Sequence, residues 1–164
     1  MPALLTGAAL EDYLHEHIPI SRAMGIGVVH ADLEQVSLSA PLEPNVNHRS
    51  TAFGGSCASL AILAAWTLAH LRVQQTGIAA RVVIQRGATE YLLPIRGTFV
   101  ATAASPGDAA WDRFARGLGR HGQARIELDA TITSGGVLVA TFSGAYAAVS
   151  GEPDDRAAAP EVGA

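Results

Sequence analysis

Hydrophobic and polar residues follow two different periods in the first quarter of the chain. Residues 10–17 carry apolar side chains at helical spacing and stop before Pro19, which predicts a short helix. Residues 25–41 alternate instead with a period of two, as a β-hairpin with one buried face does. That buried face is predicted to hold Val36, Leu38 and Ala40.

The longest apolar stretch follows a polar loop at residues 43–52. Residues 53–75 are apolar on nearly every side, begin with Gly54 and Gly55, and are followed by a glycine typical of helix C-termini. The uninterrupted apolar part, residues 56–71, is shorter than the roughly 20 residues of a membrane span. We therefore expect a buried helix and no membrane association.

The rest of the chain has the short period of strands, with one exception. Residues 108–120 place Trp111, Phe114 and Leu118 at helical spacing and are predicted to form a short inserted helix. A Ser-Gly-Gly turn at residues 134–136 joins the last two strands as a hairpin. The predicted strands are residues 81–93, broken by Gly87 and Pro94, then 97–104, 123–133 and 137–149.

This order of elements predicts an α+β protein. A helix that is apolar all round must be covered on most sides, and an antiparallel sheet curled around it does this. The predicted architecture is a hotdog fold with a short N-terminal helix and a short inserted helix. Residues 10–150 are assigned to this one domain, residues 1–9 to a flexible N-terminus, and residues 151–164, rich in Pro, Ala and acidic residues, to a disordered tail.

Composition narrows the class of protein. Hydrophobic residues make up 49% of the 164 residues and charged residues 16%, as in a globular domain rather than a disordered chain. The net charge of −4 argues against nucleic acid as a partner, because nucleic-acid binders favour a basic surface. The one cysteine, Cys57, cannot form an internal disulfide, and residues 1–10 lack the basic leader of a secretory signal, so we expect a cytoplasmic location.

Three segments of the chain resemble a known family. They are residues 14–25 (LHEHIPISRAMG), residues 41–56 (PLEPNVNHRSTAFGGS), and residues 83–86 (VIQR) followed by Tyr91, Leu92 and Pro94. Together they are similar to the hotdog-fold domain family labelled as thioesterases. This family occurs alone or fused behind an acetyltransferase-like domain, and it includes malonyl-acyl-carrier-protein decarboxylases.

The resemblance covers about residues 10–150 and implies a stand-alone form, since the fusion domain is absent. It implies an enzyme of fatty acid synthesis initiation that acts on a thioester of acyl carrier protein or CoA. The phosphopantetheine arm would belong to the substrate, and no cofactor is expected. Because one curled sheet leaves an open edge, the fold also implies at least a homodimer.

The start of the long helix is the predicted active site. Free N–H groups and the helix dipole favour negative charge there, and Gly54 and Gly55 have no side chains to keep a ligand oxygen away. A thioester carbonyl bound at this point, between Phe53 and Ser56, would gain an oxyanion hole. The alternative is that the glycines only let the helix pack closely against the sheet.

The family implies two chemistries, hydrolysis and decarboxylation. Many hotdog thioesterases have Asn, Gly and then His-Gly-Gly at this junction, with a carboxylate on the following helix as base or nucleophile. Here Asn47 and the two glycines match, but Ser50 stands at the first Gly, Phe53 replaces the His, and the helix has no Asp or Glu. Hydrolysis therefore lacks its usual means of activating water. Decarboxylation of a malonyl thioester needs only a stabilised enolate oxygen, so it is favoured.

Polar side chains of the loop are the candidate catalytic residues. Asn45 is favoured as the amide donor to the enolate oxygen and Asn47 as the residue that shapes the loop, although either could simply hold a turn after Pro44. His48 could donate a proton or be a solvated loop residue. Cys57 is expected to be a small buried hydrophobic residue, and no metal site is expected.

Two further sets of residues complete the prediction. Gln85 and Arg86, on a strand beside the helix, could position water or substrate or take part in an ion pair. Arg113, Arg116 and Arg120 form a basic face of the inserted helix, which could dock an acidic carrier protein or be a solvated face. Three functions stay open: a malonyl-thioester decarboxylase, which is favoured, an acyl-CoA or acyl-carrier-protein thioesterase, and a non-catalytic module that binds acyl carriers.

Overall fold

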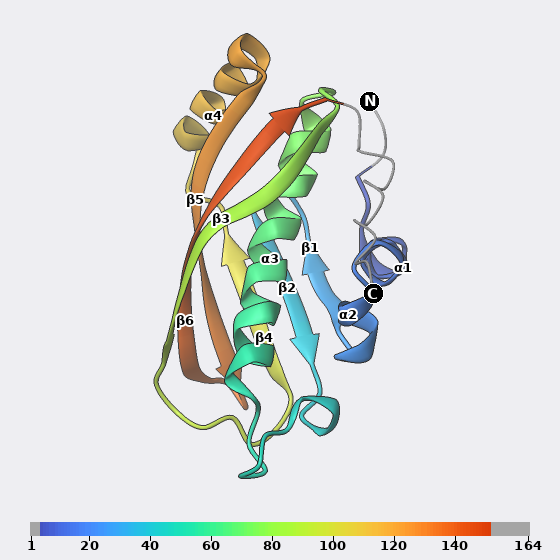
Figure 1. The fold of residues 1–164 in the computed structure, drawn as a ribbon, viewed down its shortest axis with the longest axis vertical. Helices are drawn as coiled ribbons and strands as arrows, with labels where there is room; N and C mark the ends of the chain where they lie inside the picture. The colour runs from blue at the N-terminus through green and yellow to red at the C-terminus, as the bar shows by residue number, and fades with distance from the viewer. Residues whose placement is uncertain (1–3, 152–164) are drawn as a thin grey trace, which may run out of the picture.

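One antiparallel sheet curls around a long helix in the computed structural model, which describes residues 4–151 (Figure 1). The sheet has six strands in the order β1-β2-β4-β5-β6-β3, so β1 and β3 form its two edges. The helices are α1 (Gly7–His17), α2 (Pro19–Ala23), the short 3-10 helix η1 (Glu43–Asn45), α3 (Gly54–Gln75) and α4 (Asp108–His121). The strands are β1 (Gly27–Ala31), β2 (Gln35–Ala40), β3 (Ala80–Tyr91), β4 (Phe99–Ala104), β5 (Gln123–Ser134) and β6 (Val137–Ser150).

The apolar pattern of α3 explains its place inside the curve of the sheet. Inward side chains of the sheet form continuous rows across the strands against this helix. One row runs over β2, β4, β5 and β6, and all its members are fully buried: Leu38, Ala101, Ile132 and Ala140. By length and composition α3 could cross a membrane, but 61% of its most apolar window is buried inside the protein. Its apolar sides are therefore used by the sheet, as predicted.

Most predicted elements are confirmed within a few residues, including both hairpins and the inserted helix. Two differ. The helix α2 was not predicted, and it exists because Pro19, which ends α1, is also well suited to the first position of a new helix. The predicted break of β3 at Gly87 is wrong, since β3 pairs with β6 through that glycine, and the irregularity falls at Gln85 instead. A side chain at residue 87 would lie 3.0 Å from the ring of Phe142, which explains the glycine.

The ends of the predicted domain are partly described. Residues 7–9, assigned to a flexible N-terminus, are the first turn of α1. Residues 1–3 and 152–164 lie outside the described residues, so the flexibility and disorder predicted for them stay predictions.

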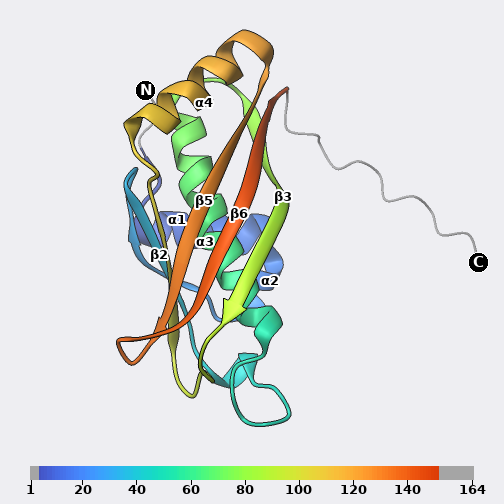
Figure 2. The same cartoon turned by 90° about the vertical axis from the view of Figure 1, so that its left-hand side faces the viewer.

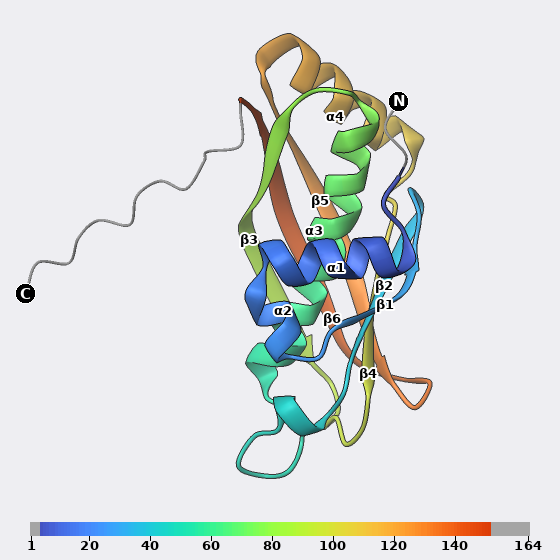
Figure 3. The same ribbon diagram turned by 90° about the vertical axis from the view of Figure 1, so that its right-hand side faces the viewer.

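Two helices pack onto α3 at different places along it. Helix α1 crosses its middle (Figure 3), where the ring of Tyr13 stacks 5.2 Å from that of His70, and His70 stacks 4.8 Å from Trp66. Helix α4 lies at the end where α3 stops (Figures 1 and 2), and there Arg72 of α3 lies 5.1 Å over the ring of Trp111. The loop between β2 and α3 lies at the opposite end of the molecule.

Candidate active site

The N-terminus of α3 presents two unused hydrogen-bond donors. Phe53 is extended, with φ −63° and ψ 132°, and its carbonyl accepts the N–H groups of Ser56 at 3.0 Å and Cys57 at 3.1 Å. No side chain caps the helix, and within residues 4–151 the N–H groups of Gly54 and Gly55 have no acceptor. These two amides are free to bind an anion or a polarised carbonyl.

Aromatic rings flank the two glycines. The Tyr91 hydroxyl donates to the Gly54 carbonyl at 2.8 Å, and a Cβ at residue 54 would lie 3.3 Å from the Tyr91 ring. A Cβ at residue 55 would lie 2.2 Å from the ring of Phe53, which is itself 58% exposed. Close packing against the sheet, the alternative considered for the glycines, is therefore found at Gly54, which meets Tyr91 of β3, and it coexists with the free amides. At Gly55 the neighbour is the loop residue Phe53 and not the sheet.

A cavity of about 360 Å³ opens beside this helix start. Its walls come from the loop before α3, the first turn of α3 and the segment after β3, and no acidic or basic side chain lines it. The lining residues are Thr51, Ala52, Gly54, Cys57, Tyr91, Leu92, Leu93, Pro94 and Ile95. Burial raises the pKa of the Cys57 thiol to about 11, so this side chain is a neutral, apolar part of the wall, as predicted.

Asn47 shapes the loop, as predicted. Its side-chain oxygen accepts the N–H groups of Arg49 at 2.8 Å and Thr51 at 3.3 Å, and its amide group donates to the Thr51 hydroxyl and the Ala52 carbonyl. These bonds close a tight turn in which Ser50 has a positive φ of 59°. The turn fixes the path by which the chain enters α3.

Asn45 does not lie in the site as a free donor. Its side chain is 2% exposed, and its amide group donates to the carbonyls of Met24 at 2.9 Å and Pro41 at 2.7 Å. Its side-chain oxygen is buried and has no hydrogen-bond partner among the described residues. The interpretation of Asn45 as the amide donor to substrate is therefore corrected, because both amide hydrogens are used inside the protein. Its backbone carbonyl accepts the Phe53 N–H at 2.7 Å, so Asn45 positions the start of α3.

The remaining loop candidate, His48, lies exposed at the tip of the turn beside Arg49. In the described part of the chain, neither side chain has a hydrogen-bond or ion-pair partner. Both can therefore reach a ligand that approaches this end of the molecule. Ser56 is half-buried and contributes its N–H to the helix start.

Gln85 and Arg86 are not part of this site within one chain. They line a separate hollow formed with residues of β5 and β6, where Arg86 pairs with Glu127 at 2.9 Å. Tyr91 lies six residues beyond Gln85, which along a strand is about 20 Å. The interpretation as residues that position substrate at the start of α3 is thus corrected for the single chain, and the ion-pair alternative holds for Arg86.

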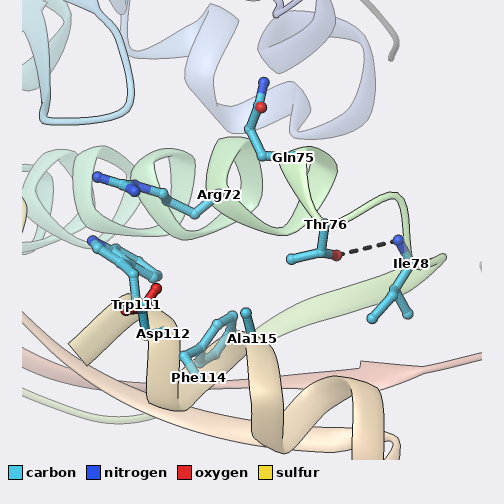
Figure 4. Close-up of a pocket in the computed structure, with 8 residues that line it drawn as sticks. All are labelled: Arg72, Gln75, Thr76, Ile78, Trp111, Asp112, Phe114 and Ala115. Atoms are coloured by element: carbon cyan, nitrogen blue, oxygen red, sulfur yellow. Dashed lines mark hydrogen bonds between the residues drawn. The ribbon is translucent and has the colours of Figure 1, made fainter. Parts of the chain in front are cut away.

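The three predicted docking arginines are exposed on α4, at the other end of α3. Figure 4 shows how α4 is attached there: Trp111, Phe114 and Ala115 face the side of α3 on which Arg72 and Thr76 lie, whereas Gln75 points away from α4. Arg113, Arg116 and Arg120 have no ion-pair partner among residues 4–151.

Tyr91 is the main site residue to which the sequence interpretation gave no role. Burial raises the pKa of its hydroxyl, and its ring forms one wall of the cavity. Tyr91 lies in one of the segments that carry the family resemblance, and this was the available signal. Nothing in the local pattern indicated that the end of β3 would meet the start of α3.

Comparison with known proteins gives a consistent result. Residues 7–150 match the model of a family described as "Putative thioesterase (yiiD_Cterm)". The structure of a protein of unknown function from Chlorobaculum tepidum TLS is similar, with 31% identity, a TM-score of 0.85 and coverage of 92% of this chain and 100% of that one. A "putative thioesterase" from Shewanella oneidensis has 27% identity and a TM-score of 0.73, covering 85% of this chain and 94% of that one. A thioesterase from Haemophilus influenzae, at 12% identity, shares the fold with a TM-score of 0.72 over 95% of this chain and 96% of that one. The predicted hotdog fold is thereby confirmed.

Proposed function

Because the chain belongs to the thioesterase family represented by the C-terminal domain of YiiD, we propose that it is an enzyme that acts on acyl thioesters. We further propose that it decarboxylates the malonyl thioester of acyl carrier protein or CoA to the acetyl thioester, a step that initiates fatty acid synthesis. The observation that carries this proposal is the pair of free amides at Gly54 and Gly55, set beside a cavity that no carboxylate lines.

Decarboxylation matches the groups that line the cavity. The bond between the malonyl carboxylate and the methylene carbon breaks, carbon dioxide leaves, and the electron pair forms a thioester enolate. The charge of the enolate rests largely on the former carbonyl oxygen, where two preorganised amides stabilise it. The enolate carbon then takes a proton from water to give the acetyl thioester. An uncharged wall favours this reaction, because a cation beside the carboxylate would stabilise the ground state more than the transition state.

The cavity also suits a short acyl group. Beyond Cys57 the interior side of α3 is closed by Leu60 and Ala61, both fully buried. A volume of about 360 Å³ has room for a malonyl group together with the end of the phosphopantetheine arm. The arm would enter past the exposed apolar side chains of Leu92 and Leu93.

Hydrolysis of an acyl thioester is the second candidate, and the family description together with the Shewanella oneidensis relative favours it. The same two amides would stabilise a tetrahedral intermediate. Water would still need a base, and α3 offers none, since its 22 residues include no Asp or Glu. His48, exposed on the loop before α3, is one side chain that could take a proton.

Product analysis distinguishes the two candidates. The purified protein is incubated with malonyl and acetyl thioesters of both CoA and acyl carrier protein, and the products are identified by mass. Acetyl thioester without free thiol supports decarboxylation. Free thiol from both substrates overturns decarboxylation in favour of hydrolysis, and no turnover of any thioester leaves the non-catalytic carrier-binding module.

The proposed enzyme is a homodimer that pairs through β3. This edge strand has 12 residues, whereas the other edge, β1, has five and is packed against α1. Val83 and Ile84 on β3 are 45% and 37% exposed, and Ile62 and Trp66 on the neighbouring side of α3 are only half-buried. A long open edge beside partly exposed apolar residues is a surface that a second copy covers well.

A further inference from the structure

The proposed carrier-docking arginines and the active site are too far apart to serve each other within one chain. The site lies at the first residues of α3, whereas α4 packs against the last turn of α3. The 22 residues of this helix span about 33 Å. The phosphopantetheine arm has about fourteen covalent bonds along its length and therefore reaches roughly 18 Å. A carrier protein bound at α4 could not place its thioester on the Gly54 amide of the same chain.

The surface of α4 nevertheless has the character of a docking site for an acidic protein. Arg113, Arg116 and Arg120 are exposed along one side of the helix, and Arg113 shares a hollow with the exposed Arg125 of β5. None of these four has an ion-pair partner among the described residues. The acidic neighbours are Glu127, which is paired with Arg86, Asp112, which lies toward α3, and Asp108, which lies in the first turn of α4. A cluster of unpaired arginines attracts the acidic surface of an acyl carrier protein.

Pairing of two subunits through β3 brings the active site of one subunit close to the α4 arginines of the other. Helix α3 and strand β3 run in opposite directions, as two hydrogen bonds between them show. Gly54 at the start of α3 bonds to Tyr91 at the end of β3, and Trp66 further along α3 bonds to Val82 near the start of β3. A two-fold axis through paired edge strands makes those strands antiparallel. The end of β3 in one subunit then meets the start of β3 in its partner, which is the end of the partner at which α4 lies.

We infer that the α4 arginines of one subunit dock the carrier protein that delivers its thioester to the active site of the partner subunit. This inference rests on the proposed thioester chemistry and names the route by which its substrate arrives. The partner of the surface is an acidic acyl carrier protein, and CoA thioesters, which lack the protein, do not need it. A docked carrier in this arrangement lies beside the partner's Gly54 rather than at the far end of its own subunit.

Mixed dimers test the inference directly. One chain carries Arg113→Glu and Arg116→Glu, and the other carries Gly54→Pro, which removes one oxyanion donor. The two chains bear different tags and are purified as a heterodimer. Delivery to the partner predicts about half of the wild-type turnover of malonyl-acyl carrier protein, because the intact site faces the intact arginines across the interface. The reciprocal heterodimer joins a wild-type chain to a chain with all three substitutions. Its turnover of the carrier substrate should fall to about half that of the homodimer with reversed arginines, because only one of its two sites is intact.

A malonyl thioester of pantetheine separates failure of the docking inference from failure of the proposed function. Both heterodimers should turn over this small substrate to a similar extent, since each has one intact site. If the reciprocal heterodimer is instead the more active one on the carrier substrate, delivery occurs within one subunit. If both heterodimers are equally active on the carrier substrate, docking takes place elsewhere, for example at Arg49. Either result overturns the inference. Absence of activity on the small substrate in the wild-type protein instead overturns the proposed function.

Discussion

At the scale of single residues, the oxyanion role of Gly54 can be tested without disturbing the helix. Gly54 is the first residue of α3, where proline is well tolerated because its missing N–H is unused by the helix. The preceding Phe53, at φ −63° and ψ 132°, already has the conformation that proline demands of its predecessor. Gly54→Pro should therefore lower turnover about a hundredfold to a thousandfold, the typical cost of one oxyanion donor.

Gly54→Ala is the matched control for that variant. It adds the same Cβ, 3.3 Å from the Tyr91 ring, but keeps the N–H group. Turnover of Gly54→Ala should remain far above that of Gly54→Pro, measured as kcat on a malonyl thioester, with circular dichroism confirming the fold of both. Equal losses in the two variants would show that crowding against Tyr91, and not the amide, is responsible.

Asn45 shows what the sequence could not indicate about a single residue. Its position in the loop predicted importance correctly, but the partners of its amide group, Met24 and Pro41, come from turns that only the folded chain brings together. Asn45→Ala leaves the carbonyl of the buried Met24 and that of the more exposed Pro41 without their donors, and should lower the free energy of unfolding by about 1–3 kcal/mol. Asn45→Asp should cost more, because it sets a carboxylate against those carbonyls.

Urea unfolding curves measure both effects on Asn45. Ser21→Ala is the control, because the Ser21 hydroxyl is also fully buried but has no hydrogen-bond partner. That substitution should leave stability almost unchanged or raise it slightly. If Asn45→Ala unfolds at the wild-type urea concentration while losing activity, the side chain acts on substrate after all.

At the scale of elements, period and turn residues were enough to predict nearly all helices and strands. The tight Gly135–Gly136 turn, with φ of 58° and 77°, and the buried face of β2 at Val36, Leu38 and Ala40 are both confirmed, although Ser37 is buried as well. The errors came where one residue serves two purposes: Pro19 both stops α1 and starts α2, and Gly87 makes room for Phe142 inside a continuous strand. Packing across elements decides these cases, and no local pattern carries it.

The contact between α1 and α3 should make stability depend on pH. Burial, and secondarily the positive charge of His17, lowers the pKa of His70 from 6.5 to about 4. The folded protein therefore favours neutral His70, so this stabilisation is complete above pH 6.5 and is lost as the pH falls toward 4. The loss amounts to up to about 3 kcal/mol.

His70→Phe keeps a ring between Tyr13 and Trp66 but cannot take up a proton. The difference in free energy of unfolding between wild type and this variant should shrink or reverse in favour of the variant between pH 6.5 and pH 4. Denaturant unfolding at several pH values measures it, with the exposed His48→Gln as a control that should follow the wild type. Parallel curves for wild type and His70→Phe would show that the imidazole titrates normally in the folded protein.

At the scale of the whole molecule, the sequence predicted the hotdog architecture, because an all-round apolar helix followed by four strands has few other solutions. It could not indicate where the candidate residues would lie relative to one another. The distance of Gln85 from the site is set by the length of β3, and that of the α4 arginines by the length of α3. The roles of these residues depend on whether a second subunit places them beside its partner's active site.

The proximity of the α4 arginines to the partner's active site requires a dimer. The wild-type protein should have twice the chain mass of 16.9 kDa by light scattering at micromolar concentration. Ile84→Lys places a charge on the open edge of β3, at a side chain 37% exposed in the single chain, and should shift the protein to monomers because the lysine would be buried without a partner in the interface. Ile20→Lys, at a 60% exposed isoleucine on α2, is the matched control and should remain dimeric.

A monomeric Ile84→Lys should also lose turnover of the carrier-linked substrate while retaining its fold by circular dichroism, since the partner's arginines are gone. A wild-type monomer, or an Ile84→Lys dimer of unchanged stability, would rule out pairing through β3 and with it the delivery of substrate from one subunit to the other.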